Sequence, residues 1–242
     1  MKRPRPALSF VLATCLAVDV ALILCAQAAG VDVIARVKVS ESGITLERSP
    51  HSDEGVVLWL TPVDNSLAKP APAPLHHYQL AQKNKQFQPH LLVIPAGSIV
   101  DFPNLDPFFH NVFSLFNGRK FDLGLYESGK TRSVHFDRPG VSFIFCNIHP
   151  EMSAVVVSVP TPYFASSTPD GSLVVHNVTP GTYDLHLWAI GSGDNLSSAQ
   201  IHRVIVADAP TDMGAFTVQS APAGPHKNKF GEDYDLRRPD KY

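Results

Sequence analysis

Short apolar runs, separated by turns rich in Pro and Gly, follow one another along most of the chain. Residues 91–104 (LLVIPAGSIVDFPN) contain two apolar runs separated by a turn with Pro and Gly, which predicts two strands joined tightly. The same pattern predicts strands within 31–40, 55–63, 134–145, 153–159 and 171–189. After the first 30 residues, no long stretch carries the 3.6-residue apolar repeat of an amphipathic helix. The pattern therefore predicts an all-β protein.

The first 30 residues follow a different pattern. MKRPRP is basic, ALSFVLATCLAVDVALIL is mostly apolar, and AQAAG offers small residues for cleavage. This order is typical of a secretory signal peptide, here residues 1–28. The alternative is an uncleaved anchor, which Asp19 in the middle of the run disfavours because a central charge is costly in a membrane. We therefore expect an exported, periplasmic protein without stable membrane insertion after cleavage.

Charge excludes one class of function. The chain of 242 residues has 20 Lys and Arg against 22 Asp and Glu, a net charge of −2. Proteins that bind nucleic acids carry an excess of basic residues, which this sequence lacks. We therefore expect no nucleic-acid partner.

A cluster of metal-ligating residue types lies at 145–152, which reads FCNIHPEM. Cys15 and Cys25 would leave with the signal peptide, so Cys146 would be the only cysteine of the exported chain. A lone thiol in an oxidising compartment is either buried and inert or occupied by a ligand. The cysteine follows a strand in which Val141, Phe143 and Phe145 share one face. The segment from Cys146 to Met152 is thus predicted as a tight loop between two strands.

A second imidazole, His110, comes from a separate loop 36 positions earlier, just before another β-rich run. Two imidazoles and a thiolate, with a thioether as a weak axial donor, form the ligand set of a blue-copper site. Zinc also binds Cys and His, but it has little use for a methionine. The ligand types therefore favour one copper ion that cycles between Cu(I) and Cu(II).

The segment 75–159 resembles the cupredoxins, and within them amicyanin. The resemblance rests on His110-Asn111-Val112, on the strand PGVSFIFC that ends in Cys146, and on the Cys-x2-His-x2-Met spacing. It implies a Greek-key β-sandwich in which His110, Cys146 and His149 form a trigonal plane and Met152 is the axial ligand. It also implies that Asn111 ties the two ligand loops together by hydrogen bonds. Glu151 departs from amicyanin, which has an apolar residue at that place.

The resemblance implies a type 1 copper protein that carries single electrons between redox partner proteins, and not an enzyme. A copper held by four protein donors has no open position for a substrate. Two alternatives stay open at this point: a copper carrier or sensor, and a binding module with an accessory copper site.

The flanking segments resemble a carboxypeptidase-regulatory or transthyretin-like β-sandwich. The resemblance rests on TPDGSLVVHNVTPGTYDLHLWA at 168–189, where Tyr183, Leu185, Leu187 and Ala189 share one face. We expect residues 30–74 and 160–218 to form a second, smaller, discontinuous β-sandwich around the cupredoxin domain, followed by a polar tail at 219–242 that is at most loosely docked. The alternative is that the strands within 31–63 extend the cupredoxin barrel.

One motif points to a different chemistry. Residues 124–131 (GLYESGKT) formally match a phosphate-binding loop, which needs a parallel strand before it and a helix after it. A strand-like run follows instead, so we expect a surface turn and no nucleotide.

Overall fold

The fold was obtained as a computed structural model that describes residues 30–41, 55–64, 76–115, 118–221 and 226–234. Strands and turns make up these residues, with a single 3₁₀ turn, η1, at Leu196–Ser198. The fold class is therefore all-β, as the alternating pattern predicts. The signal-peptide prediction at 1–28 lies outside the described residues.

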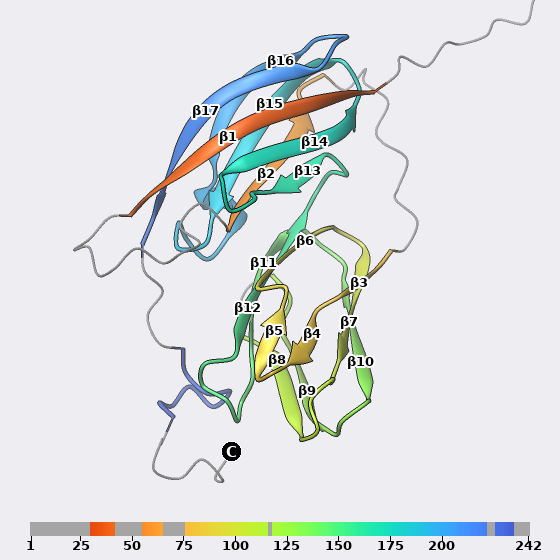
Figure 1. The fold of residues 1–242 in the computed structure, drawn as a ribbon, viewed down its shortest axis with the longest axis vertical. Coiled ribbons are helices and arrows are strands. Elements are labelled where there is room, and N and C mark those ends of the chain that lie inside the picture. The colour runs from red at the N-terminus through yellow and green to blue at the C-terminus, as the bar shows by residue number, and fades with distance from the viewer. Residues whose placement is uncertain (1–29, 42–54, 65–75, 116–117, 222–225, 235–242) are drawn as a thin grey trace, which may run out of the picture.

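The lower sandwich in Figure 1 contains the central part of the chain. Its five-stranded sheet has the order β6 (Leu91–Pro95), β12 (Ser153–Val159), β11 (Gly140–Phe145), β8 (His110–Ser114) and β9 (Phe121–Tyr126). Its three-stranded sheet has the order β10 (Thr131–Phe136), β7 (Ser98–Pro103) and β3 (His77–Gln79). A hairpin of β4 (Ala81–Lys83) and β5 (Gln86–Gln88) completes it.

The upper sandwich in Figure 1 combines the first two strands of the described chain with the strands that follow β12. One sheet has the order β14 (Ser172–Val178), β1 (Val31–Glu41) and β17 (Thr211–Ser220). The other has the order β13 (Phe164–Ser166), β2 (Val56–Pro62), β15 (Gly181–Ala189) and β16 (Gln200–Val206). The early strands β1 and β2 thus pair with late strands.

These pairings are the ones that a discontinuous second sandwich requires. β1 pairs with β14 and β17, and β2 pairs with β13 and β15. The division into 75–159 and 30–74 plus 160–218 stays a prediction, because strand pairing does not show that either part folds alone. The transthyretin-like resemblance of the second part stays a prediction as well.

Each sandwich has its own apolar core. The upper core includes Tyr183, Leu185, Leu187 and Ala189, the four residues that the sequence pattern places on one face. The lower core is built around aromatic and aliphatic side chains of both sheets and includes Cys146 and Met152. Two of the four candidate ligands therefore belong to the packed core of this sandwich.

A third apolar cluster joins the two sandwiches. Trp59 and Trp188 of the upper sandwich pack in it with Val155, Val157 and Val159 of β12. Ala154 and Val156, on the opposite face of β12, belong to the lower core. β12 is therefore buried on both faces, which explains its nearly continuous apolar sequence.

The same cluster also accounts for the apolar face that the sequence predicts for β11. Val141 and Phe143 pack into or against the cluster between the sandwiches, whereas Ile144 and Cys146 face the lower core. At Val141 and Phe143, this face packs toward the second sandwich, whereas Phe145 contacts Phe113 and His226. Alternation alone does not identify these neighbours.

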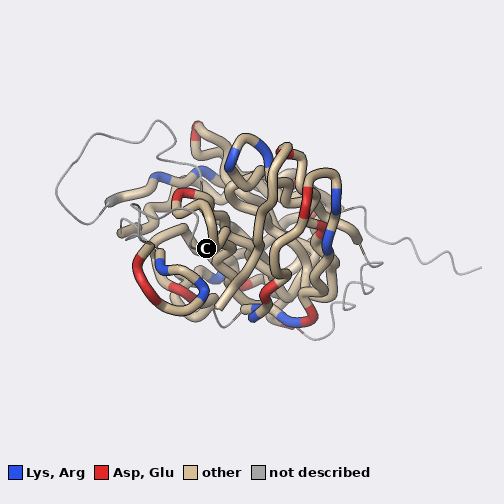
Figure 2. The backbone as a smooth tube through the Cα atoms, turned by 90° about the horizontal axis from the view of Figure 1, so that it is seen from below, with Lys and Arg blue, Asp and Glu red and all other residues tan. Residues whose placement is uncertain are grey.

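Charged residues of both signs are interspersed on the side of the molecule seen in Figure 2. No helix in the described part of the chain is long and apolar enough to span a membrane. The GLYESGKT motif covers the end of β9, a turn and the first residue of β10. The surface turn that we expected is therefore present, between two strands.

The joining cluster predicts a stability effect at Trp188, which is fully buried. Trp188→Ala should lower the free energy of unfolding by about 3–5 kcal/mol, because it removes a large apolar side chain and leaves a cavity. Ile205→Ala is the control, since Ile205 is 72% exposed and its truncation should change stability by less than about 0.5 kcal/mol. Denaturant titration measures both. Equal effects of the two substitutions would contradict the assigned cluster.

Candidate metal centre

Three side chains with metal-ligating atoms converge at one end of the lower sandwich. His110 is the first residue of β8, Cys146 directly follows β11, and His149 lies in the turn before β12. The sulfur of Cys146 lies 3.8 Å from Nδ1 of His110 and 3.6 Å from Nδ1 of His149. All three donor atoms lie within 4.8 Å of one another. Segments 36 positions apart thus present one thiol and two imidazoles to a common point.

This spacing fits a bound metal ion. A first-row divalent metal such as zinc lies about 2.0–2.1 Å from imidazole nitrogen and about 2.3 Å from thiolate sulfur. With angles of about 110–120° at the metal, such bonds separate sulfur and nitrogen by roughly 3.6–3.8 Å. The two observed separations fall in this range. The two sulfur–nitrogen separations are therefore compatible with one metal ion held by these three residues.

Met152 completes the set of four residues that the sequence singles out. Its side chain is fully buried and belongs to the same core cluster as Cys146. The Cys146 N–H donates to the Met152 carbonyl at 3.2 Å, and the Met152 N–H donates to the His149 carbonyl at 3.0 Å. These two bonds close the Cys146–Met152 turn and fix the places of all three of its candidate ligands.

Burial differs among the four side chains. His110, Cys146 and Met152 are fully buried, whereas His149 is half-buried. The ring of Phe108 contacts both imidazoles, with centroid distances of 5.1 Å to His110 and 5.8 Å to His149. His149 is therefore the candidate ligand that reaches toward the surface.

Burial sets the protonation of the metal-free site. It raises the pKa of the Cys146 thiol, although the backbone N–H groups of Asn111, Ile148 and His149 act in the opposite direction. It also lowers the pKa of both His110 and His149, whose mutual repulsion when charged lowers that of His149 further. Without a cation, the site therefore holds a neutral thiol and neutral imidazoles. A bound cation would stabilise the thiolate, for which three N–H donors are in place.

Asn111 links the two ligand segments through its backbone. Its N–H interacts with the Cys146 sulfur, and its side-chain amide donates to Asp122 of β9 at 2.7 Å. The backbone of Asn111 thus contacts the cysteine segment, whereas its side chain bonds to a neighbouring strand; its role in tying the ligand loops together stays a prediction.

Sequence reasoning missed Asp106. Its carboxylate lies 2.8 Å from Nε2 of His110, the ring nitrogen that faces away from Cys146. An acidic residue four positions before a candidate ligand histidine is a signal that the sequence offers. It was not distinctive, because carboxylates are common in loops.

Sequence reasoning also missed the segment 226–234, which we call the clasp. It was expected to be loosely docked at most, yet it lies beside the turn that carries Cys146 and His149 (Figure 1). The Lys229 N–H donates to the Asn147 side chain at 3.0 Å, and the Tyr234 hydroxyl donates to the Cys146 carbonyl at 2.9 Å. His226 stacks on Phe145 at 4.1 Å. The clasp is therefore held directly by the residues around the candidate ligand cysteine.

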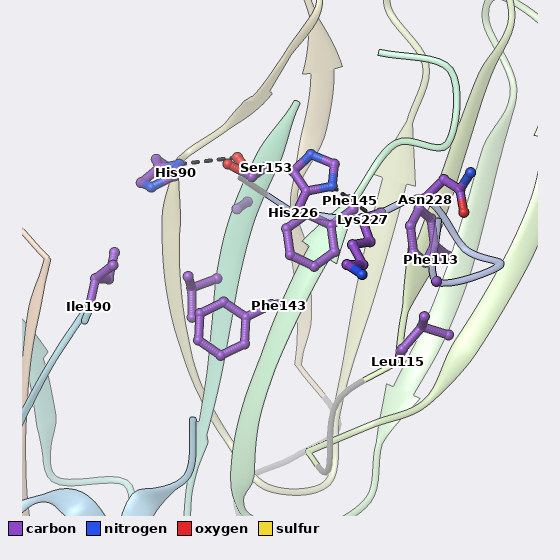
Figure 3. Close-up of a pocket in the computed structure, with 13 residues that line it drawn as sticks. His90, Phe113, Leu115, Phe143, Phe145, Ser153, Ile190, His226, Lys227 and Asn228 are labelled. Carbon is purple, nitrogen blue, oxygen red and sulfur yellow. Dashed lines mark hydrogen bonds between the residues drawn. The ribbon is translucent and has the colours of Figure 1, made fainter. Parts of the chain in front are cut away.

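An apolar pocket of about 600 Å³ lies between the clasp and the outer face of the five-stranded sheet (Figure 3). Phe113, Phe143 and Phe145 line it from the sheet, and His226 and Lys227 line it from the clasp. Its wall at Phe145 is one residue from Cys146, so the clasp covers part of this apolar face next to the site.

No family model and no curated protein matches the chain. A Cu-containing nitrite reductase (NirK) from Thermus scotoductus SA-01 is 23% identical, with a TM-score of 0.34, over 41% of this chain and 27% of that one. A purple cupredoxin from Nitrosopumilus maritimus is 24% identical, with a TM-score of 0.31, over 34% of this chain and 99% of that one. A reduced mutant form of amicyanin is 18% identical, with a TM-score of 0.33, over 41% of this chain and 98% of that one.

The lower sandwich is cupredoxin-like in fold. Two sheets enclose one core, β6 runs parallel to β12, and the loops at one end bring a His-Cys-His-Met set together. This confirms the fold that the sequence motifs imply. The ligand roles of His110, Cys146, His149 and Met152 stay a prediction.

The clasp predicts a local effect at Tyr234. Tyr234→Phe removes one hydrogen bond to Cys146, which should lower stability by about 1 kcal/mol. It should also speed amide hydrogen exchange in the Cys146–Met152 turn. Tyr163→Phe is the matched control, because it removes a hydroxyl contact with Thr179 in the upper sandwich. Exchange in the turn that is the same in both variants would contradict the role of the clasp.

Proposed function

We propose that the protein is an exported type 1 copper protein that carries single electrons between redox partner proteins. One observation carries the proposal: the Cys146 sulfur lies 3.6 and 3.8 Å from the Nδ1 atoms of two histidines, in a buried cluster that includes Met152. The ligands would be His110, Cys146, His149 and Met152, and the centre would hold one copper ion.

The donor set favours copper over zinc. Thiolate and thioether sulfur suit Cu(I), and imidazole suits Cu(II). The four residues together would therefore bind copper in both oxidation states. Copper bound there would supply a one-electron couple. The closed turn and the packed core would hold the donors in one arrangement, so that little reorganisation accompanies a change of charge.

The four candidate ligands favour electron transfer over catalysis at the metal. Four protein donors would leave no position for a substrate, and three of them are fully buried. The half-buried edge of His149, beside Phe108, would form the route for electrons to and from a partner. The partner would dock against this end of the lower sandwich.

A copper carrier or sensor is the second candidate, and a binding module with an accessory copper site is the third. A carrier needs donors that exchange readily, whereas here the turn is closed by two backbone hydrogen bonds and covered by the clasp. A reversible redox couple measured by voltammetry would favour the electron-transfer function. Fast loss of Cu(I) to a chelator would favour the copper-carrier function.

The spectrum of the purified protein with added Cu(II) tests the proposal. We expect an intense thiolate-to-copper band in the visible range and a narrow copper hyperfine splitting in EPR. Cys146→Ser should abolish the band and weaken copper binding, while the unfolding transition of the metal-free protein is retained because Cys146 is one small residue of a larger core. Ser153→Ala, at the first residue of β12 directly after the turn, removes no candidate donor and is the control. A colourless, tetragonal Cu(II) complex of the unmodified protein would refute the assignment.

The axial role of Met152 has its own test. Met152→Leu keeps the volume of the side chain and should retain copper and colour, with a higher reduction potential because a weak donor to Cu(II) is lost. Met213→Leu, in β17 of the upper sandwich, is the matched control and should leave the potential unchanged. A potential that does not differ between the two variants would remove Met152 from the ligand set.

A further inference from the structure

Asp106 forms a buried pair with one of the candidate ligands. Its Oδ2 lies 2.8 Å from Nε2 of His110, and the two side chains are 5% and 0% exposed. Asp106 lies in the loop between β7 and β8, whereas the sulfur of Cys146 faces the other nitrogen of the same ring. His110 is thus held on both sides, by a carboxylate at Nε2 and by the candidate metal position at Nδ1.

The carboxylate is itself fixed by the β4–β5 hairpin. The N–H groups of Asn84 and Lys85 donate to its two oxygens at 2.6 and 2.9 Å. Both residues have a φ of 55°, the left-handed conformation of a two-residue hairpin turn, so their N–H groups converge on one anion. The turn therefore forms a socket for Asp106.

A second set of bonds fixes the loop around Asp106. The Asp106 N–H donates to Oδ1 of Asn104 at 3.1 Å. The amide of Asn104 in turn donates to the carbonyls of Phe108 and Tyr126, at 2.8 and 3.2 Å. The position of the carboxylate is therefore determined by backbone and amide contacts that do not involve a metal.

Both oxygens of Asp106 already act as hydrogen-bond acceptors, Oδ1 from the Asn84 N–H and Oδ2 from the Lys85 N–H. The contact between Oδ2 and Nε2 of His110 therefore needs its donor on the ring, so Nε2 carries the ring proton. The lone pair is then on Nδ1, which faces Cys146.

We propose that Asp106 is a positioning residue of the metal centre, which selects the Nε2–H tautomer of His110 and strengthens Nδ1 as a donor to Cu(II). The part that concerns copper rests on the proposed function, whereas the tautomer is a property of the metal-free protein. A carboxylate behind a ligand histidine raises the basicity of the ring and places a negative charge near the metal. Both effects stabilise Cu(II) more than Cu(I), because Cu(II) carries the higher charge.

Two substitutions separate orientation from charge. Asp106→Asn retains an oxygen that can accept from His110 and removes the negative charge. Asp106→Leu removes both the acceptor and the charge at similar size. The control is Asp101→Asn on β7, where a carboxylate lies 2.9 Å from Nδ1 of His77, on the surface of the same sandwich. It removes an equal charge from a carboxylate–histidine pair outside the candidate centre.

The first measurement uses the metal-free, full-length protein at slightly alkaline pH. Nitrogen-15 shifts and couplings of the histidine rings report which nitrogen carries the proton. We expect His110 to be protonated at Nε2 in the unmodified protein, in Asp106→Asn and in Asp101→Asn, and to become a mixture of tautomers in Asp106→Leu. A His110 ring protonated at Nδ1 in the unmodified protein overturns the proposal, whether or not copper binds.

The second measurement uses the copper-loaded protein. Loss of an outer partner of a ligand histidine typically weakens metal binding about 10- to 100-fold. For Asp106→Asn we expect a loss of this size in Cu(II) affinity, a smaller loss in Cu(I) affinity, and therefore a higher reduction potential. Asp101→Asn should leave affinity and potential unchanged.

The two measurements distinguish failure of this proposal from failure of the proposed function. An unchanged potential in Asp106→Asn, with the thiolate-to-copper band present, overturns the role of Asp106 and leaves the copper centre standing. If the unmodified protein does not form the band, the copper function fails, and the tautomer in Asp106→Leu still decides whether Asp106 positions His110. If Asp106→Leu does not fold, a potential that rises in Asp106→Asn alone supports the proposal.

Discussion

Burial of β12 on both faces is the constraint on which the arrangement of the protein depends. One face packs into the lower core through Ala154 and Val156, and the other packs against Trp59 and Trp188 of the upper sandwich. The strand begins one residue after Met152, so the end of the ligand turn is anchored to both sandwiches. The second sandwich is therefore part of the support of the candidate centre and not a separate appendage.

Burial and the surrounding groups have opposite effects on the ionisation of the Cys146 thiol. Burial disfavours a bare thiolate at Cys146, while three backbone N–H groups and two neutral imidazoles are arranged to accept one when a cation is present. The Asp106 carboxylate contacts His110 on the side away from Cys146. The polypeptide thus orients the candidate donors by its own contacts, and the clasp contacts the turn from outside.

The local signals were sufficient for the strands and for the candidate ligands. Alternation and turn residues predicted the β-architecture, and the spacing from Cys146 to Met152 with an upstream His110 predicted which side chains converge. The pairing of β1 with β17 and the neighbour of the Val141 and Phe143 face depend on contacts far apart in sequence, which alternation does not encode. The clasp was missed because hydrogen bonds and one ring stack hold it, and a composition typical of a loose tail does not indicate such contacts.

The position of the clasp in the chain has a consequence for biosynthesis. Residues 226–234 follow every strand of both sandwiches, yet they close over Cys146 and Asn147. During synthesis, the residues of the cysteine turn are therefore made before those of its cover. Under the proposed function, this order would give a metal access to the donors before the final segment docks.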